Sequence, residues 1–487
     1  MNTAGQSLPM VTKLKQLFQK SEDVIFQEYF FQQSKVFTIK CESMIDQQIL
    51  YTVVLPNIEN LYLNSSNQTI TEEAIEQLPI PEIKKLTKND DIITAVFNGN
   101  LILFFEESQL LYSCNIAQKP NRNPEETNME VMVRGARDNF IEDLATNIAL
   151  IRKRIPTNSL CVEKMELGRR SKTKIALLYF DDIANKDILT ELKKQLKKID
   201  TDIIISADSL MEFVNEKNWL LPATNYTGTP DFAIQSLIRG RFLILVDGVA
   251  YGVITPVNIF YLLKTGEDYE SSIIYGTFER FIRLIGGIVG ILLPSFWLAL
   301  THFHQDQLPL QLLATVVITN IGLPFPAVLE MLIILMMFEI LREAGLRLPS
   351  KVGGIIGVIG GLIIGDAAIR SGITSPALVV VIATSTIASY TLVNQQFENF
   401  VIIIRILFII VTAFLGLFGF FICFYLFILY VANTRVFGVP YLNISADLSF
   451  NNLKKTLFRL PKYKYKFRPN FLDPQDESRN NERNSND

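Results

Sequence analysis

The distribution of apolar residues divides the chain near residue 284. Before this point, short apolar runs alternate with charged segments, whereas apolar residues dominate from there to residue 432. The first pattern is typical of a folded, water-exposed region and the second of helices surrounded by lipid. The sequence therefore predicts a water-facing region over 1–283, a helical membrane domain over 284–432 and a basic tail over 433–487.

The water-facing region divides into two predicted α/β subdomains. In the first, residues 1–128, apolar runs over 37–56 predict short strands or other buried elements, and the segment from Thr71 to Leu86 predicts a helix. Residues 95–105 predict a hairpin around Gly99. The Pro- and Asn-rich stretch QKPNRNPEETN then marks a linker to the second subdomain.

The second subdomain, residues 129–283, begins with a helix over about 138–154, predicted from an apolar stripe at Phe140, Leu144, Ile148 and Ile151. Further elements are strands over 175–180, 202–206 and a pair within 241–256, with a helix over 187–198. Strands that alternate with helices indicate an α/β domain.

The membrane domain is predicted from five apolar stretches and one broken piece: 284–301, 327–341, 352–370, 376–393 and 400–432, with the broken piece at 308–323. The polar loop HFHQDQ carries no Lys or Arg, so we expect it outside the cell. Both termini are expected inside, which requires an even number of crossings. We therefore predict an α-helical polytopic domain with four crossings plus re-entrant elements.

Two features set this domain apart from a plain anchor. The broken element at Gly322, Pro324 and Pro326 lacks backbone N–H donors at its prolines. Its backbone therefore needs hydrogen-bond partners from protein or water rather than lipid. The second feature is a Gly-rich helix, in which small residues at four-residue spacing allow close helix packing: Gly353, Gly357, Gly361 and Gly365. Asp366 in this helix is costly in lipid, so we expect it to face a cavity or a partner.

Composition argues against several classes of protein. The net charge of −3 provides no basic field for nucleic acid, so no such partner is predicted. The 4 cysteines are far apart and form no CxxC pair, which argues against a disulfide framework or a zinc site. We find no nucleophile, base and metal set and no phosphate loop, so no enzyme activity, cofactor or metal is predicted.

The ends of the chain carry charge rather than targeting signals. The N-terminus, MNTAGQSLPMVTKLKQLFQK, lacks the apolar core of a signal peptide, so residues 1–283 are expected to be cytoplasmic. The tail interleaves basic residues with Tyr463, Tyr465 and Phe467, which fits contact with an anionic cytoplasmic leaflet. Its end, DPQDESRNNERNSND, is expected to be disordered.

One basic loop in the cytoplasmic region opens on Gly168. This loop either binds an anion or a partner protein or is simply exposed to solvent. A solvent-exposed loop is the commoner case. We take four basic residues as candidates for cytoplasmic coupling: Arg134, Arg169, Arg170 and Lys172.

Eight stretches, in this order, also resemble the A subunit of the spore germinant receptors, the GerA-type family of endospore-forming bacteria. They are VRGARDNFIEDLATNIALIRKRI (133–155), GRRSKTKIALLYFDDIA (168–184), GRFLILVDG (240–248), GLPFPAVLE (322–330), FEILREAGLRLP (338–349), GGLIIGDAAI (360–369), GITSPALVVV (372–381) and FGVPYL (437–442). The resemblance runs from about residue 35 to 443.

This resemblance implies a membrane subunit that helps to trigger spore germination. Family A subunits lie in the inner spore membrane with a B subunit, which is similar to amino-acid transporters, and a C lipoprotein. The complex senses small nutrients, and the A subunit is thought to form a homo-oligomer, a pentamer, that acts as a nutrient-gated channel for monovalent cations. The implied site residues are Asp366, Glu330 and Glu339 as pore or gating acids, beside the glycines of the Gly-rich helix.

The chain departs from the family pattern at several charged positions. An Arg-Glu pair common before Gly-x-Pro-Phe-Pro is replaced here by Asn320 and Ile321, and a Glu of the next helix by Leu335. Asp366 stands where Glu or Gln is usual. These departures leave ion selectivity and gating contacts open.

Two other functions remain open on the sequence alone. The broken GLPFP element could form half of a discontinuous site in a transporter or a transport accessory. Alternatively, the α/β subdomains could bind a cytoplasmic partner while the helices only anchor a signalling scaffold.

Overall fold

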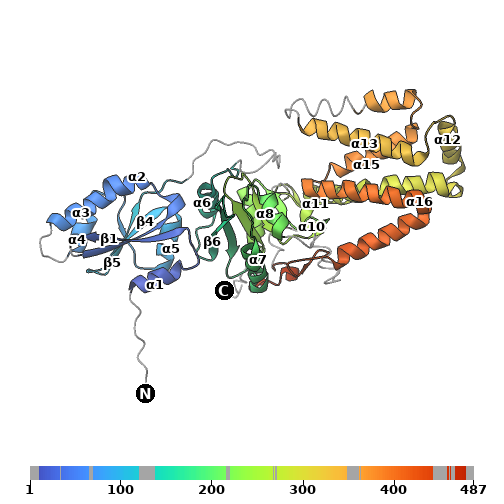
Figure 1. The fold of residues 1–487 in the computed structure, drawn as a ribbon. Helices are drawn as coiled ribbons and strands as arrows, with labels where there is room; N and C mark the ends of the chain where they lie inside the picture. Colours follow the sequence, from blue (N-terminus) through green and yellow to red (C-terminus); the bar gives the residue numbers. More distant parts are fainter. Residues whose placement is uncertain are drawn as a thin grey trace, which may run out of the picture. The chain divides into compact units, whose positions relative to one another are not determined.

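The computed structural model describes residues 10–32, 34–64, 70–119, 138–214, 220–266, 268, 271–347, 361, 363–442, 458–459, 461 and 467–478. The chain forms two units. Unit 1 comprises residues 1–216, 224–256 and 465–487, and unit 2 comprises 217–223 and 257–464. Unit 1 contains two sheets and unit 2 is helical (Figure 1), so the α/β region followed by a helical part is confirmed.

The first subdomain of unit 1 is built on a five-stranded antiparallel sheet of order β1-β2-β4-β5-β3. Its strands are β1 (Val24–Phe31), β2 (Ser34–Cys41), β3 (Lys84–Lys85), β4 (Asn100–Phe105) and β5 (Leu110–Asn115). Its helices are α1 (Met10–Leu17), α2 (Gln47–Ile49), α3 (Leu55–Asn64), α4 (Glu72–Glu76) and α5 (Asn89–Phe97).

Strand β4 shows why this sheet is buried on both faces. Phe104 packs in a core with residues of α1 and α5, whereas its neighbours Leu103 and Phe105 pack with residues of α3 and α4. Successive side chains of a strand point to opposite faces, so the continuous run NLILFF fills two cores at once.

Three predictions for this subdomain are corrected. The hairpin predicted over 95–105 is wrong because α5 ends at Phe97, and Gly99, with φ of +91°, follows the helix as a glycine cap. The helix predicted from Thr71 to Leu86 ends at Glu76, ahead of the prolines at 79 and 81, which cannot continue a helix. The apolar run over 37–56 is a strand only to Cys41, and α2 and α3 follow it.

The second subdomain has another five-stranded antiparallel sheet, of order β6-β7-β9-β10-β8. Its strands are β6 (Leu160–Leu167), β7 (Thr173–Phe180), β8 (Asn225–Thr227), β9 (Phe242–Val246) and β10 (Gly252–Thr255). Its helices are α6 (Leu144–Arg154), α7 (Lys186–Lys198), α8 (Ala207–Val214) and α9 (Pro230–Leu237).

Most elements predicted here are confirmed, including the strand over 175–180, the helix over 187–198 and the strand pair within 241–256. The strand predicted over 202–206 is wrong, since this apolar run forms no ladder. Only Ile204 is buried in it, while Ile203 and Ile205 are 50% and 78% exposed.

A buried ion pair joins the two subdomains of unit 1. Arg152 of α6 donates from Nε and Nη2 to the two carboxylate oxygens of Asp23, at 2.7 and 2.8 Å. Its guanidinium also lies 4.0 Å from the ring centroid of Phe97. Because both charged side chains are almost fully buried, neither could remain there without the other.

The C-terminal end of the chain also belongs to unit 1. The end of the tail was expected to be disordered from Asp473 onward, but residues 473–478 are held by hydrogen bonds to the second subdomain and to Arg468. The expectation of disorder is therefore wrong for this stretch.

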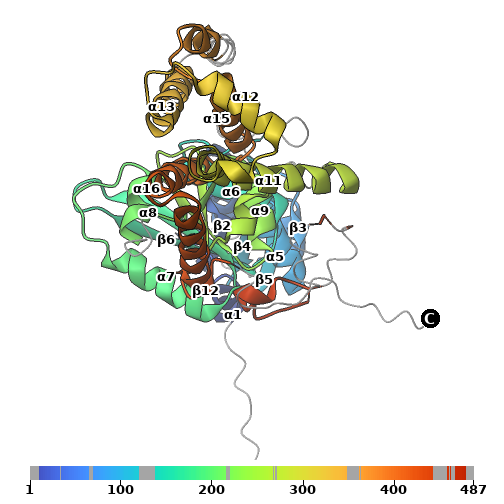
Figure 2. The same cartoon turned by 90° about the vertical axis from the view of Figure 1, so that its right-hand side faces the viewer.

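The described part of unit 2 includes helices α10 (Ile259–Leu262), α11 (Ile273–Leu298), α12 (Leu310–Asn320), α13 (Ala327–Leu346), α15 (Pro376–Ser389) and α16 (Gln395–Asn433), with a short hairpin of β11 (Arg435–Val436) and β12 (Val439–Pro440). Helix α11 packs against both α15 and α16 (Figure 2). In the described part of the chain, two helices are long and apolar enough to cross a membrane, Ile273–Phe303 and Gln395–Asn433.

Helix α11 begins at Ile273, well before the apolar stretch predicted from residue 284. The difference arises from a buried cluster at its start, in which Asp268 accepts hydrogen bonds from Arg280 at 3.0 Å and from Arg283 at 2.7 Å. Asp268 is fully buried and the arginines nearly so. Charges that mark a water-exposed segment in sequence are here neutralised inside the fold.

Helix α16 is two helices that double back on each other at Gly416, where φ is 62° and ψ is −143°. The ring centroids of Phe400 and Phe427 lie 6.1 Å apart. In a straight helix, residues that far apart in sequence would be separated by about 40 Å. The run 400–432, predicted as one apolar stretch, is therefore part of a helical hairpin.

Gly416→Ala tests this turn. An alanine Cβ would lie 2.8 Å from Cγ of Phe303, in a backbone conformation that only glycine adopts readily. We expect the free energy of unfolding of the purified chain in detergent to fall by about 2–4 kcal/mol. Gly438→Ala is the matched control, because Gly438 also has positive φ but no neighbour within 4 Å. Equal losses for the two variants would contradict the proposed close contact.

The cysteines of unit 1 give a second test. Burial raises the pKa of Cys41 and Cys114 to about 12 and that of Cys161 to about 11. Because the thiolate is the nucleophile, we expect none of the three to be alkylated by iodoacetamide at pH 8 in the folded chain, and all three to react after denaturation. Mass spectrometry of the alkylated peptides measures this, and rapid labelling of any of them in the folded state would disprove it.

Candidate functional site

Four ionisable side chains form a buried network between α13 and α16. Glu339 of α13 accepts hydrogen bonds from Arg405 Nη2 at 2.6 Å and from Arg342 Nε at 2.9 Å. Arg342 Nη1 donates in turn to Glu398 at 3.0 Å. The side chain of Arg405 is fully buried, and the other three are 14–17% exposed.

Arg405 extends the network to two further helices. Its Nη1 donates to Ser385 Oγ of α15 at 3.1 Å, and Ser385 Oγ donates to the Gly290 carbonyl of α11 at 3.0 Å. Gly290 has no side chain, so α15 can approach its backbone closely. A single chain of polar contacts therefore connects α13, α16, α15 and α11.

The network is formally neutral, since it contains two carboxylates and two guanidinium groups. Glu339 contacts both arginines and Arg342 contacts both carboxylates, so each of these residues has two partners. Arg405 Nε has no hydrogen-bond partner among the described residues. Removal of one charge would leave its partner buried and uncompensated.

Glu330 is an acid of a different kind. It lies in the first turn of α13, is 3% exposed and accepts a hydrogen bond from the backbone of Ser375, the N-cap of α15. Thr374, beside this cap, is buried with a hydroxyl that has no partner among the described residues. Glu330 forms no ion pair within the described part of the chain.

Asp366 lies in a helical segment over 363–370 and pairs with Arg370 of the next turn at 2.8 Å. Both side chains are exposed in the single chain. Near it, an added Cβ at Gly361 would lie 3.7 Å from Phe338, and at Gly365 3.5 Å from Val379. Both glycines thus lie close to neighbouring helices, whereas Gly353 and Gly357 fall outside the described residues.

The broken element joins α12 to α13. Gly322 has φ of +90°. Pro326 is the N-cap of α13, and its carbonyl accepts a hydrogen bond from the backbone N–H of Leu329 at 2.9 Å. Pro324 lies between Gly322 and Pro326. Helix α12 therefore ends before Gly322, and Pro326 caps the start of α13.

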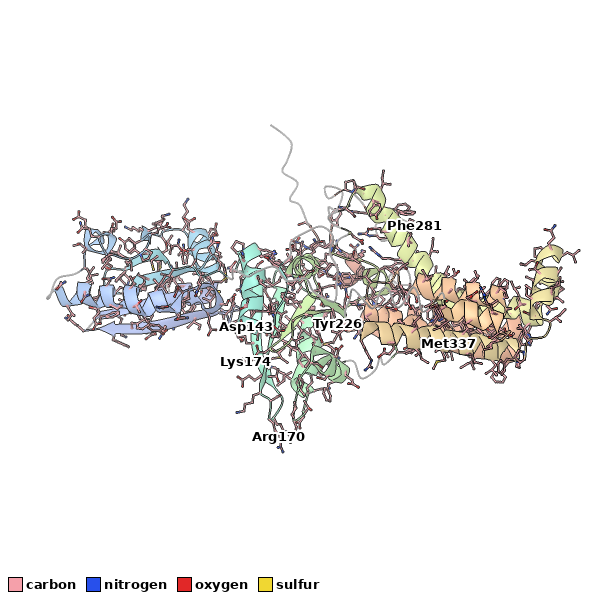
Figure 3. The ribbon with its side chains drawn as sticks, turned by 90° about the horizontal axis from the view of Figure 1, so that it is seen from above. Asp143, Arg170, Lys174, Tyr226, Phe281 and Met337 are labelled. Atoms are coloured by element: carbon pink, nitrogen blue, oxygen red, sulfur yellow. The ribbon has the colours of Figure 1, made fainter. Side chains whose placement is uncertain are left out.

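The basic loop lies at the turn between β6 and β7, where Figure 3 shows Arg170 at the tip. Arg169 donates from Nε and Nη2 to Asp200 at 2.7 and 2.5 Å, and Arg170 lies 3.4 Å from Asp202. Lys172 has positive φ in this turn. Both arginines already face aspartates, so little positive charge is left for an anion. Arg134 falls outside the described residues.

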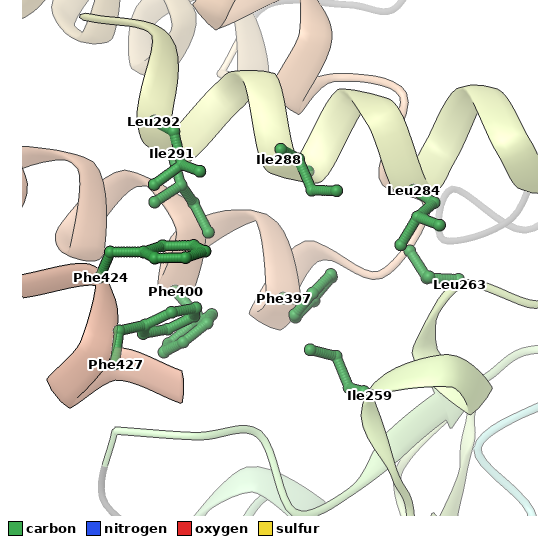
Figure 4. Close-up of a pocket in the computed structure, with 11 residues that line it drawn as sticks. Ile259, Leu263, Leu284, Ile288, Ile291, Leu292, Phe397, Phe400, Phe424 and Phe427 are labelled. Atoms are coloured by element: carbon green, nitrogen blue, oxygen red, sulfur yellow. The ribbon is translucent and has the colours of Figure 1, made fainter. Parts of the chain in front are cut away.

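Unit 2 also contains an apolar cavity of about 110 Å³, between α10, α11 and the two halves of α16 (Figure 4). Every side chain that lines it is aliphatic or phenylalanine. A polar nutrient would find no hydrogen-bond partner there, so the cavity does not suit one.

The sequence points to Glu339 but not to the three residues that form the network with it. Arg342 lies just beyond the apolar stretch predicted over 327–341, and neither Glu398 nor Arg405 is singled out by the sequence pattern. A signal was present, because Glu398 and Arg405 are seven residues apart and share one face of a helix.

Glu339→Gln tests the network. The change leaves Arg405 buried without a counter-charge, and we expect the free energy of unfolding in detergent to fall by about 3–5 kcal/mol. The double variant Glu339→Gln with Arg405→Gln should recover part of this loss, because no uncompensated charge then remains. Asp366→Asn, in an exposed pair, should change stability little. Strictly additive losses in the double variant would show that the two residues do not interact.

Comparison with known proteins assigns the chain to a family. The profile described as "Bacillus/Clostridium GerA spore germination protein" matches residues 12–471. Spore germination protein XA of Bacillus anthracis is 38% identical over 446 residues, 91% of each chain. Spore germination protein KA of Bacillus subtilis is 32% identical over 476 residues, 96% of this chain and 87% of that protein.

A solved structure is also similar to part of the chain. The N-terminal domain of the A subunit of the Bacillus megaterium spore germinant receptor GerK3 aligns with a TM-score of 0.40 and 23% identity, covering 50% of this chain and 92% of that domain. The profile match over most of the chain and the identity to protein XA show that this chain belongs to the GerA family of spore germination proteins.

Proposed function

We propose that the chain is the A-type membrane subunit of a spore nutrient-germinant receptor and acts by forming a nutrient-gated channel for monovalent cations. Membership of the GerA family carries this proposal, because relatives that align along most of the chain are named spore germination proteins. Its partners would be the B subunit, the C lipoprotein and further copies of itself. It would act as a receptor component rather than an enzyme, in the inner spore membrane, with unit 1 in the cytoplasm.

The helices of unit 2 support a multi-pass membrane location. Helices α11 and α16 pass the length and composition needed to span, and α16 folds back on itself. Ionisable residues within such helices are rare and usually mark a functional site. The network around Glu339 is therefore the best candidate for a gating element.

A neutral network with shared partners suits gating. A nutrient bound to a partner subunit can open a channel only if it interacts differently with the two states. Helices that exchange ion-pair partners can shift while every buried charge stays compensated, so two arrangements can lie close in energy. The broken element at Gly322, Pro324 and Pro326 and the glycines facing Phe338 and Val379 would permit such a shift.

Glu330 is the best candidate to attract the ion. Glu339 is neutralised by two arginines, and Asp366 by Arg370, whereas Glu330 has no cationic partner among the described residues. Acidic residues repeated around the axis of an oligomer attract cations, as in other cation channels. Arg169, Arg170 and Lys172 remain proposed coupling residues of unit 1, and the two arginines pair with Asp200 and Asp202.

The channel is tested with the complete receptor in liposomes, exposed to a panel of single amino acids, sugars and nucleosides. We expect at least one nutrient to release K⁺ and Na⁺, and Glu330→Gln to lower that flux by roughly tenfold or more without loss of assembled protein. Glu343→Gln, at an exposed i,i+4 pair with Arg347, is the control and should conduct normally.

Liposomes that stay impermeable with every nutrient would disprove the channel. Saturable uptake of a labelled nutrient by this subunit alone would instead favour a transporter. An unchanged flux in Glu330→Gln would remove Glu330 from the ion path.

A further inference from the structure

Residues 467–478 follow unit 2 in the sequence but pack on the second subdomain of unit 1. We call this segment the C-terminal strap. Three hydrogen bonds fix its backbone and its arginine to the subdomain: Gln475 N to Ile183 O at 3.0 Å, Asn185 Nδ2 to Asp473 O at 3.0 Å, and Arg468 Nε to Ile238 O at 3.0 Å. The contacts lie at both ends of the segment, so the whole strap is docked.

Buried side chains show that the docking is specific. Leu472 is 1% exposed, and Arg468 is 9% exposed while it pairs with Asp476 at 2.6 Å. The ring of Phe471 lies 5.8 Å from the guanidinium of Arg241. A solvated tail would leave such side chains in water, so this part of unit 1 is a built surface for the strap.

The receiving surface comes from two connections in the second subdomain. One precedes α7 and contains Ile183 and Asn185, and the other joins α9 to β9 and contains Ile238 and Gly240. Gly240 has φ of +90°, and a Cβ built on it would lie 3.8 Å from Cβ of Pro474. The strap therefore packs against two backbone turns and not against a charged patch.

We propose that this surface is a docking site for the strap of the same chain, so that unit 2 is attached to the second subdomain at both of its ends. The chain leaves unit 1 after Pro256 and returns to it at Tyr465. Because the strap is covalently linked to the chain, its effective concentration at the surface is high, and modest contacts keep it docked. A movement of the second subdomain then reaches the start and the end of unit 2 together. This last step rests on the proposed function.

Docking is tested by a disulfide in the full chain. The spacing between Gly240 and Pro474 matches the Cβ separation of a disulfide, about 3.8 Å. We expect Gly240→Cys with Pro474→Cys to cross-link within one chain under mild oxidation, and the four native cysteines, all buried, to stay reduced. Gly248→Cys with Pro474→Cys is the control, because Gly248 also has positive φ but no atom within 4 Å of an added Cβ. Absence of the first cross-link, equal cross-linking in the control, or a cross-link found only between two chains would each overturn the proposal.

Transmission is tested by nutrient-triggered cation flux. Leu472→Asp places a charge in the buried contact, and we expect it to lower the flux by roughly tenfold at equal amounts of assembled protein. Glu477→Ala is the control, because Glu477 is exposed and contacts Arg468 through its backbone carbonyl. The oxidised Gly240→Cys, Pro474→Cys variant should conduct normally, since the strap stays docked.

A normal flux in Leu472→Asp, or a flux blocked by the disulfide, would show that the docked strap does not transmit movement of the second subdomain to unit 2. Failure of the wild-type channel would disprove the proposed function alone, because the cross-link is measured without any flux.

Discussion

The structure depends on the pairing of buried guanidinium groups with carboxylates. Buried arginines join separate segments of the chain: Arg152 joins the two subdomains, Arg283 joins α11 to the segment before it, and Arg405 lies among four helices. In each case a carboxylate lies within 3 Å. Since an uncompensated buried charge costs several kcal/mol, each pair fixes the relative position of the segments that supply it. The pairs contribute more to specificity of arrangement than to net stability.

Predictions succeeded where the local sequence decides the structure. Elements set by local periodicity were predictable, such as α7 with its apolar stripe and the strands β9 and β10 on either side of Asp247-Gly248. Glycine was harder to interpret, because Asn98-Gly99 can turn a hairpin or cap a helix, and only the packing of Gly99 against Met44 decides between them. Likewise, Gly416 in an apolar run gave no sign that α16 reverses there.

The candidate site was predictable only in part. Asp366 is conspicuous in sequence because it is an acid in an apolar helix, whereas Glu330 and Glu339 were named from the resemblance to the family. Whether such an acid is free or neutralised depends on residues of other helices, as with Arg405, or of the next turn, as with Arg370. The structure therefore separates three acids that the sequence treats alike: a shared partner in a network, an exposed ion pair, and a buried carboxylate with only a backbone donor.

This separation bears on the charges that the chain lacks relative to the family pattern. Asn320 and Ile321 lie at the end of α12, next to the break before α13, and Leu335 is buried in an apolar core of unit 2. None of the three belongs to the network around Glu339. The network is neutral with the residues that this chain retains, so loss of the other charges leaves no buried partner uncompensated. In the proposed channel, the contacts for gating would thus persist in a chain whose acids near the break differ, and the attraction of an ion there would depend more on Glu330.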